Sequence, residues 1–345
     1  MRASGPFTMP LLPFLHRVAA GEHLTPEDAH QAMSVLLEGE ASEPLVAAFL
    51  VALKMKGETA DELAGFARAM RERVIPVDAG DDVIDTCGAG GDGHGTFNIS
   101  TIAALVMAGA GARVAKHGNR SISNAGAGSA ELMQALGVRF AMTPAEASRA
   151  VREIGIAFLF APNLHPAMKY AQPVRRELRM RTVFNLLGPL ANPARAQVQL
   201  IGAPSSGAAQ IMAEALARLG TRHSFIVHGH DGLDEISTTG PTDVYDVCGG
   251  RVARFLWTPE QFGIRRAALE DLKGGDASRN AEIARQVLEG ASGAARDIVL
   301  VNAAAGLIAG GMAQDLGAAM KLAARSIDSG EARARLEQLR GKFPA

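Results

Sequence analysis

The feature that most constrains the fold of this chain is a glycine-rich stretch between a short apolar run and a long apolar helical pattern. Val83-Ile84-Asp85 has the composition of the end of a buried strand, and five glycines follow between positions 88 and 95. Asn98-Ile99-Ser100-Thr101 then opens an apolar helical pattern that extends to Ala110. Glycines let the backbone approach a ligand closely, and a helix N-terminus adds unpaired N–H donors. The stretch therefore predicts a strand, a phosphate-binding loop and a helix.

Two kinds of phosphate ligand fit such a loop. Gly88, Gly90 and Gly93 have the spacing of the dinucleotide fingerprint, which requires an acidic residue about 20 positions further on to hold a ribose hydroxyl. From Gly93 through Ala130 the chain has no Asp or Glu, and Lys116-His117-Gly118-Asn119-Arg120 makes a second loop cationic. A cationic loop beside a glycine-rich loop favours a polyphosphate over a dinucleotide. A turn that binds no ligand is the alternative.

Composition supports a compact enzyme and limits its partners. The chain has 345 residues, 48% of them hydrophobic, and a formal net charge of −1, which gives no overall attraction to nucleic acid or anionic membranes. Cys87 and Cys248 are too few for a disulfide framework, as is typical of a reducing compartment. Pro6, Pro10 and Pro13 interrupt the place of a signal-peptide core, and no apolar run reaches the ~20 residues of a membrane span. We therefore predict a cytoplasmic protein without nucleic-acid or membrane partners.

The order of helical and strand patterns predicts two domains. From about Pro10 to Arg73 the pattern is helical, with helix-start signals at Thr25 and Thr59. After Pro76 strands alternate with helices, which predicts a largely parallel sheet with ligands at the carboxyl ends of its strands. The strand candidates are residues 83–85, 113–116, 156–160, 197–201 and 223–228, and the helix candidates include 102–109, 130–136, 144–154 and 208–219.

The fold class is thus α/β, with a small all-helical N-terminal domain and a large α/β domain whose central sheet is largely parallel. We place the helical domain at residues 1–75 and the α/β domain at 76–164 and 191–345. The arginine-rich segment 165–190 is neither a clean strand nor a single helix, and we expect it to return to the helical domain as a hinge over the site. The apolar helix at 45–53 must be buried against other helices or against a second subunit.

A pair of acids is a candidate metal site. Asp234-Glu235 follows the strand that ends at Val227-His228-Gly229, and adjacent carboxylates at a strand end can hold Mg²⁺ directly or through water. Two neighbouring acids in a loop are usually only solvated, so both interpretations stay open. Lys116 is likewise either a phosphate ligand or a solvated surface lysine.

A set of short motifs occurs in order along the chain. They are Gly88-Ala89-Gly90-Gly91-Asp92, Asn98-Ile99-Ser100-Thr101, Lys116-His117-Gly118-Asn119-Arg120, Gly128-Ser129-Ala130-Glu131, His165-Pro166-Ala167-Met168-Lys169, Pro173-Val174-Arg175, residues 181–193 and Asp234-Glu235-Ile236-Ser237. Together they resemble the anthranilate phosphoribosyltransferase family of tryptophan biosynthesis over about residues 10 to 340. Ala89 stands where that family usually has Thr, which removes a hydroxyl but leaves the backbone donors.

The resemblance implies a fold, a reaction and an assembly. The fold is that of nucleoside phosphorylases and class III phosphoribosyltransferases. The reaction transfers the phosphoribosyl group of phosphoribosyl pyrophosphate to the amine of anthranilate and releases pyrophosphate with the help of Mg²⁺. The expected assembly is a homodimer. Because an aromatic amine is unprotonated at neutral pH, we assign no catalytic acid or base, and we expect catalysis by positioning and charge stabilisation.

The resemblance also implies the residues of the site. For phosphoribosyl pyrophosphate they are Gly88, Gly91, Asp92, Thr96, Asn98, Ser100, Thr101, Lys116, Ser123 and Ser129. For anthranilate they are Gly88, His117, Asn119, His165 and Arg175, and for the metal Ser100, Asp234 and Glu235. Arg175 is the candidate for the anthranilate carboxylate, because a guanidinium matches a planar carboxylate with paired hydrogen bonds. A single surface arginine among four is the alternative for Arg175, and a lone histidine is more often structural than catalytic.

Two competing functions remain at this stage. A nucleoside phosphorylase of the same architecture would use inorganic phosphate and would carry a different loop from Gly90-Gly91-Asp92. A nucleic-acid-binding relative that had lost the transferase would need a basic groove and would lack the metal acids, whereas 35 Lys and Arg nearly cancel 36 Asp and Glu here, and Asp234-Glu235 is intact.

Overall fold

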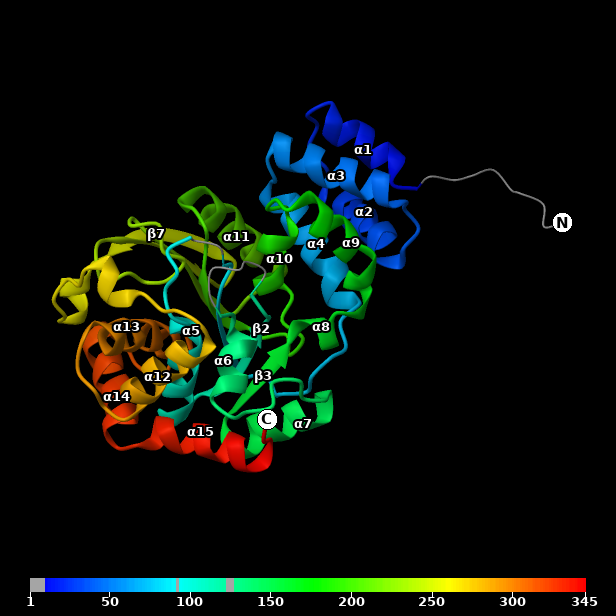
Figure 1. The fold of residues 1–345 in the computed structure, drawn as a ribbon. Helices are drawn as coiled ribbons and strands as arrows, with labels where there is room; N and C mark the ends of the chain where they lie inside the picture. Colours follow the sequence, from blue (N-terminus) through cyan, green and yellow to red (C-terminus); the bar gives the residue numbers. More distant parts are fainter. Residues whose placement is uncertain (1–9, 91–92, 122–126) are drawn as a thin grey trace. The chain divides into compact units, whose positions relative to one another are not determined.

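The chain forms two compact units, one helical and one built around a sheet. The computed structural model describes residues 10–90, 93–121 and 127–345 (Figure 1). Residues 1–74 and 165–191 belong to the first unit, and residues 75–164 and 192–345 belong to the second. The described part of the first unit contains helices and no strand, and the second contains a seven-stranded sheet. The predicted fold class, helical plus largely parallel α/β, is confirmed.

The helical unit combines an N-terminal bundle with a segment that returns from the middle of the chain. Its elements are α1 (Leu12–Ala19), α2 (Pro26–Glu38), α3 (Glu43–Lys56), α4 (Ala60–Glu72), η1 (Pro166–Tyr170), α9 (Gln172–Leu178) and α10 (Phe184–Leu190). The returning segment packs η1 on α2, α9 on α3 and α10 on α4. The hydroxyls of Thr25 and Thr59 accept hydrogen bonds from the third residues of α2 and α4, so the predicted helix starts are confirmed.

A buried ion pair fixes the loops of the helical unit. Lys56 Nζ lies 2.8 Å from Glu62 Oε2, and both side chains are almost completely buried. The Glu62 carboxylate also accepts hydrogen bonds from the backbone N–H of Leu24 and of Thr59, each at 2.9 Å. One carboxylate therefore ties the start of α4 to the loop before α2 and to the end of α3.

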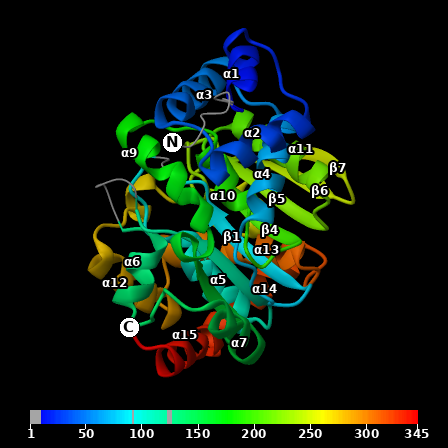
Figure 2. The ribbon, with the colours of Figure 1, turned by 90° about the vertical axis from the view of Figure 1, so that its right-hand side faces the viewer.

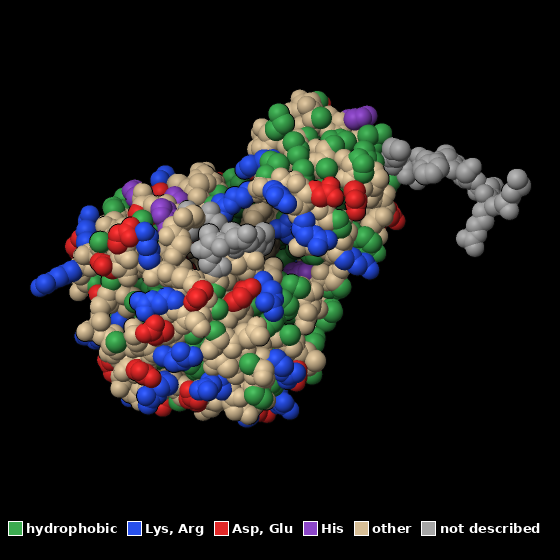
Figure 3. Space-filling view, viewed as in Figure 1, with side chains coloured by type: hydrophobic (Ala, Val, Ile, Leu, Met, Phe, Trp, Pro, Cys, Tyr) green, Lys and Arg blue, Asp and Glu red, His purple; other side chains and the backbone are tan. Residues whose placement is uncertain are grey.

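The apolar helix α3 is buried on one side only. Phe49, Leu50 and Leu53 are in the core of the helical unit, whereas Leu45 is half-buried and Met55 is 83% exposed. Figure 3 shows hydrophobic side chains gathered over α1 and α3 at the surface of this unit. Core packing is thus confirmed for the buried side of this helix, and a contact with a second subunit stays a prediction for the exposed side.

The sheet of the second unit has the strand order β3-β2-β1-β4-β5-β6-β7. Its strands are β1 (Val83–Gly88), β2 (Arg113–Gly118), β3 (Ile156–Phe160), β4 (Val198–Gly202), β5 (His223–Gly229), β6 (Thr242–Cys248) and β7 (Arg251–Trp257). The first five in this order are parallel, β6 is antiparallel to β5, and β7 is antiparallel to β6 (Figure 2). The carboxyl ends of β1, β2 and β4 therefore meet at one edge of the sheet.

Helices cover both faces of this sheet. They are α5 (Ile99–Gly109), α6 (Ser129–Ala135), α7 (Pro144–Ile154), α8 (Ala161–Leu164), α11 (Ser206–Leu219), η2 (Pro259–Phe262), η3 (Leu269–Leu272), α12 (Ala277–Leu288), α13 (Ala294–Ala309), α14 (Leu316–Asp328) and α15 (Glu331–Lys342). The apolar helix α5 lies between β1 and β2 on one side and α13, α14 and α15 on the other, which explains its apolar character all round. Helix α11 covers β5, β6 and β7 on the opposite face from α13 (Figure 1).

The sequence patterns predict five strands, and the structure adds the hairpin β6–β7. The two strands are joined by Gly249-Gly250, whose φ angles are +56° and +76°. Two consecutive residues with positive φ form the two-residue turn that matches the twist of antiparallel strands, and Gly-Gly is one of its sequence signals. That dipeptide is the signal in the sequence for the additional hairpin. No helix in the described part of the chain combines the length and apolar character needed to cross a membrane.

The Lys56–Glu62 pair gives a stability prediction. Glu62→Ala should lower the free energy of unfolding by about 3–5 kcal/mol, because it leaves a buried ammonium group without its counter-ion. Urea denaturation followed by circular dichroism measures the change. The control is Glu27→Ala, since Glu27 is 75% exposed and 3.6 Å from Arg68, and its loss should cost less than about 1 kcal/mol. Equal effects of the two substitutions would contradict a structural role for the buried pair.

Candidate phosphate and metal site

The glycine-rich loop starts at the carboxyl end of β1 and is held by the neighbouring strand. Gly88 pairs with Gly202 at the end of β4, and the N–H of Ala89 donates to the carbonyl oxygen of Gly202 at 2.8 Å. Gly90 has a φ of +72°, a conformation that favours glycine. The chain then reaches Asn98 and enters α5, so the predicted succession of strand, loop and helix is confirmed.

The acid pair after β5 occupies the backbone donors of this loop and helix. The N–H of Gly90 donates to Asp234 Oδ2 at 2.6 Å, and the N–H of Ser100 donates to Glu235 Oε1 at 3.1 Å. Each acid is only 7% exposed, so the interpretation as a solvated loop pair is wrong. Because Ser100 lies in the first turn of α5, the helix dipole stabilises the negative charge of Glu235. The structure thus brings Ser100, Asp234 and Glu235 together, as expected of a shared site.

Two glycines allow the acid pair to come this close. A Cβ atom on Gly88 would lie 2.3 Å from Asp234 Oδ2, and a Cβ atom on Gly202 would lie 1.5 Å from the backbone oxygen of Asp234. The first contact involves a side chain, whereas the second involves backbone that cannot rotate away. Gly202 was not among the residues expected from the sequence, although a glycine at the end of a buried strand was a signal for close backbone approach.

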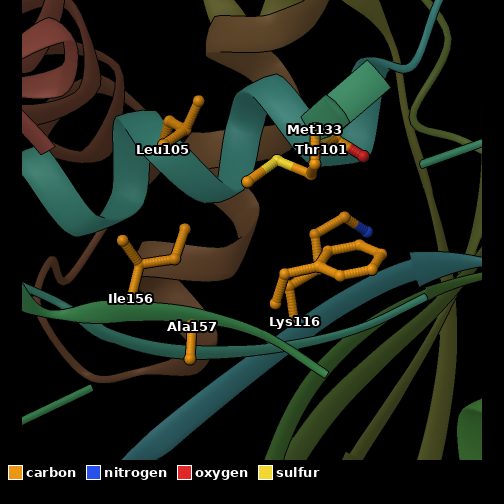
Figure 4. Close-up of a pocket in the computed structure, with 7 residues that line it drawn as sticks. Thr101, Leu105, Lys116, Met133, Ile156 and Ala157 are labelled. Atoms are coloured by element: carbon orange, nitrogen blue, oxygen red, sulfur yellow. The ribbon is translucent and has the colours of Figure 1, made fainter. Parts of the chain in front are cut away.

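Lys116 is buried behind the start of α5, so the interpretation as a solvated surface lysine is wrong. It is 3% exposed, and its Nζ donates to the Thr86 carbonyl oxygen at 2.7 Å and to Ser100 Oγ at 3.4 Å. Thr101 and Leu105 of α5 and Lys116 of β2 line a small cavity from opposite sides (Figure 4). The Lys116 ammonium group places positive charge beneath the first turn of α5.

A further buried acid, Asp85, holds the backbone of β2. Lys116, His117 and Gly118 belong to this strand, so the prediction that they lie in a loop is wrong. Its Oδ1 accepts a hydrogen bond from the N–H of His117 at 2.9 Å, and burial raises the pKa of Asp85. The same burial raises the pKa of the Cys87 thiol well above its ordinary value, which leaves Cys87 a buried neutral group. The side chain of His117 is buried as well. Asp85 was not expected in the site, although an acid inside an apolar strand was a visible signal.

Asn98 connects three segments at the start of α5. Its Nδ2 donates to the Ala127 carbonyl oxygen at 2.8 Å, and its Oδ1 accepts from Asn280 Nδ2 of α12 at 3.0 Å. Thr96, just before it, forms an isolated bridge with Lys273. The side chain of Asn98 therefore organises the loops, and its role toward phosphoribosyl pyrophosphate stays a prediction.

The loop after β2 carries Asn119, and α6 begins with Ser129. Ser129 Oγ donates to the carbonyl oxygen of Asn119 at 3.1 Å, which joins the start of this loop to the start of α6. Gly91, Asp92 and Ser123 lie outside the described residues.

His165 and Arg175 both lie within the returning segment that the sequence predicts at residues 165–190, and both belong to the helical unit. The Arg175 guanidinium lies over the Phe184 ring at 5.3 Å, and burial lowers the pKa of Arg175. Among the described residues no carboxylate pairs with it, and it is half-buried, while Arg176 and Arg179 are exposed. Arg176 and Arg179 are thus surface arginines, whereas Arg175 is partly buried and does not fit that interpretation.

The donor set at this site fits a hard cation. Within the described ranges no three side chains of His, Cys, Asp or Glu gather into a metal cage. Mg²⁺ does not need such a cage, because it usually binds one or two protein carboxylates together with waters and phosphate oxygens. The adjacent carboxylates of Asp234 and Glu235 beside the Ser100 hydroxyl supply that kind of ligand.

Two family models match the chain in succession. The model described as glycosyl transferase family, helical bundle domain, matches residues 12–74, and that described as glycosyl transferase family, a/b domain, matches residues 80–333. Together they cover most of both structural units.

Curated relatives and solved structures match over nearly the whole chain. A relative from Solibacter usitatus named anthranilate phosphoribosyltransferase is 58% identical over 96% of this chain and 98% of its own, and a Moorella thermoacetica relative of the same name is 51% identical over 94% and 96%. The crystal structure of anthranilate phosphoribosyltransferase from Thermus thermophilus aligns with a TM-score of 0.90 and 44% identity, over 95% of this chain and 98% of its own. The Saccharomyces cerevisiae enzyme in complex with PRPP and Mg aligns with a TM-score of 0.86 and 30% identity, over 96% and 98%.

The contact between Gly202 and Asp234 gives a prediction for ligand binding. Gly202→Ala should weaken Mg²⁺-dependent binding of inorganic pyrophosphate at least about tenfold, or about 1.4 kcal/mol, because the new methyl group displaces the backbone of the acid pair. Isothermal titration calorimetry measures the affinity. The control is Gly207→Ala in the first turn of α11, where a Cβ atom meets nothing within 4 Å and binding should not change. Unchanged affinity in the Gly202 variant would show that the acid pair tolerates another backbone path.

Proposed function

The chain belongs to the anthranilate phosphoribosyltransferase family, and from that premise we propose how its residues divide the work of the reaction. The enzyme transfers the phosphoribosyl group of phosphoribosyl pyrophosphate to the amine of anthranilate and releases pyrophosphate, the second step from chorismate in tryptophan biosynthesis. The observation that carries the assignment of roles is the pair of hydrogen bonds that joins Asp234 to Gly90 and Glu235 to Ser100.

We assign the pyrophosphate group to the glycine-rich loop and the first turn of α5. Backbone N–H groups at a helix start and in a glycine loop bind phosphate oxygens well, and here they are the donors of Gly90 and Ser100. The Lys116 ammonium group lies directly behind Ser100 and adds positive charge while its side chain stays buried. These groups favour the departing pyrophosphate more as its negative charge grows, which is how fixed dipoles accelerate such a step.

We propose that Asp234 and Glu235, with the hydroxyl of Ser100, hold Mg²⁺. A bound Mg²⁺ supplies positive charge that offsets the charge of the leaving pyrophosphate. Because the two carboxylates occupy the donors that we assign to pyrophosphate, both acids must turn away from Gly90 and Ser100 when the substrate binds. The acid pair thus changes partners between the free and the bound protein. The structure of the yeast relative in complex with PRPP and Mg supports this use of the metal.

Arg175 is our proposed contact for the carboxylate of anthranilate. The guanidinium is half-buried against Phe184, and no carboxylate among the described residues neutralises it. A partly desolvated cation gains from an anionic ligand, and the planar guanidinium fits a carboxylate attached to an aromatic ring. The proposed roles of His117, Asn119 and His165 toward anthranilate rest on the family resemblance.

We propose that two copies of the chain assemble through the helical unit. The exposed side of α3 carries Met55 at 83% exposure, together with partly exposed Leu45 and Val51. Apolar side chains that gather on one face of a helix are typical of a surface that another protein covers. A second copy is the occupant that the family resemblance implies.

The cytoplasm is the compartment that we propose for the enzyme. Cys87 and Cys248 are both free thiols, one buried and one exposed. Free thiols persist in a reducing compartment, and the substrate of this reaction is a metabolite of biosynthesis.

The metal assignment is tested with a charge-neutral variant of the acid pair. The wild-type enzyme should remove the fluorescence of anthranilate when phosphoribosyl pyrophosphate and Mg²⁺ are present, and Asp234→Asn combined with Glu235→Gln should abolish this turnover. In the absence of metal, the same variant should bind pyrophosphate about tenfold more tightly than wild type, because two like charges no longer face the phosphate oxygens. Calorimetry with a metal chelator measures the second effect.

The control for this experiment is Asp231→Asn, in the same loop. The Asp231 carboxylate accepts hydrogen bonds from the hydroxyls of Ser237 and Thr239. It takes no part in the two hydrogen bonds that hold the acid pair. Its replacement should leave metal-free pyrophosphate binding near the wild-type value. If the neutral pair variant keeps Mg²⁺-dependent turnover, the acid pair does not hold the metal.

A separate prediction concerns the acceptor. Arg175→Ala should raise the KM for anthranilate about tenfold to a hundredfold, since a charge-assisted hydrogen bond to a carboxylate contributes roughly 1.5–3 kcal/mol. The KM for phosphoribosyl pyrophosphate should change much less. Steady-state kinetics with each substrate varied in turn measures both values, and Arg176→Ala on the same helix is the matched control. Equal changes in both KM values, or none, would assign Arg175 to another task.

A further inference from the structure

We propose that Asn302, in the middle of α13, is a positioning residue that sets the backbone of the acid pair for metal binding. Asn302 is 66 positions from Ile236 in the sequence, and Ile236 directly follows Glu235. The inference rests on the proposed role of Asp234 and Glu235 as Mg²⁺ ligands.

The side-chain amide of Asn302 forms a two-way pair with one residue of the acid loop. The N–H of Ile236 donates to Asn302 Oδ1 at 2.9 Å, and Asn302 Nδ2 donates to the carbonyl oxygen of Ile236 at 3.0 Å. The second hydrogen on Nδ2 goes to the carbonyl oxygen of Ile298, one turn earlier in α13, at 2.9 Å. Both amide hydrogens are therefore used, and the orientation of the side chain is fixed from both sides.

The surroundings of Asn302 make this pair rigid. Asn302 is fully buried, and Ile236 is 1% exposed in the main core. A buried polar group costs free energy unless it is hydrogen-bonded, so the amide cannot leave Ile236 without leaving several polar atoms without partners. Helix α13 is otherwise apolar along its buried side, and it packs on β4 and β5, the strands that lead to the site. The asparagine thus connects a fixed part of the core to the acid loop.

The acid loop is constrained at two points, one on each side of Glu235. On one side the backbone oxygen of Asp234 lies against Gly202, which has room for no side chain there. On the other side Asn302 holds the backbone N–H and carbonyl oxygen of Ile236. Because both carboxylates must exchange backbone donors for a metal ion, their side chains have to move while the main chain stays in place. Asn302 holds the main chain of the acid loop in place. The carboxylates can therefore change partners by changing their side-chain rotamers, without a movement of the whole loop.

The test compares Asn302→Ala with a control that loses an equally buried hydrogen bond elsewhere. Asn302→Ala should raise the dissociation constant for Mn²⁺, measured calorimetrically with inorganic pyrophosphate present, about tenfold. It should raise the Mg²⁺ concentration for half-maximal turnover by the same factor while kcat at saturating Mg²⁺ stays within about threefold of wild type. In the metal-free protein, amide hydrogen exchange of residues 232–238 should become faster.

The control is Ser326→Ala in α14. Ser326 is 2% exposed, and its Oγ donates to the Val106 carbonyl oxygen at 2.7 Å, far along the chain from the acid loop. This variant should lower the melting temperature but leave Mn²⁺ affinity and exchange of residues 232–238 unchanged. If Asn302→Ala does not fold, Asn302→Asp replaces it, because it keeps the volume and the acceptor for Ile236 N–H and loses the donor to the carbonyl oxygen of Ile236.

The outcomes separate this inference from the proposed function. Wild-type Mn²⁺ affinity in the folded Asn302 variant, or an equal loss of affinity in Ser326→Ala, would overturn the positioning role. The neutral variant of Asp234 and Glu235 is measured alongside. If that variant binds Mn²⁺ as wild type does, the metal assignment itself fails. If it loses the metal while the Asn302 variant keeps it, only the positioning role fails.

Discussion

The hydrogen bonds from the backbone of Gly90 and Ser100 to Asp234 and Glu235 are the interactions on which the rest of the site depends. They join a loop and a helix start to a second loop that is more than a hundred positions away in the sequence. A buried carboxylate is costly unless hydrogen bonds and positive charge compensate it, and here backbone dipoles and the Lys116 ammonium group provide both. Strand order brings these groups to one edge of the sheet, because β1, β2, β4 and β5 are parallel.

The close approach of these segments explains the positions of several other residues at the site. Gly88 and Gly202 end neighbouring strands, and each leaves the space that Asp234 needs. Lys116 ends within reach of Ser100 because β2 packs against α5. The carboxylate of Asp85 fixes the backbone of His117 near the end of β2, so the loop after this strand starts from a defined position. The strand order, the glycines and the buried charges thus together determine which groups meet at the carboxyl ends of the strands.

The parts of the site that depend on local patterns could be predicted from the sequence. The strand, glycine loop and helix at residues 83–109 are adjacent in the chain, so their order shows in the pattern of glycines and apolar residues. Burial of Lys116 could not be predicted, since a lysine looks the same in a loop and beneath a helix. Gly202 and Asn302 act through partners 32 and 66 positions away, and a single sequence does not reveal such pairs. The hairpin at Gly249-Gly250 is different, because its turn chemistry is local and would have allowed its prediction.

The glycine-rich loop also has a physical reason to hold carboxylates. Backbone N–H groups without partners in a partly buried place cost about 1–3 kcal/mol each, and the glycine loop and the start of α5 bring such donors to the same edge of the sheet. Asp234 and Glu235 satisfy one donor in each segment. In the function that we propose, substrate binding replaces one anion by another at these donors, and the released carboxylates become available to a metal ion. Under this proposal the binding of the metal and the binding of pyrophosphate are coupled, because neither the backbone donors nor the carboxylates can be left without a partner.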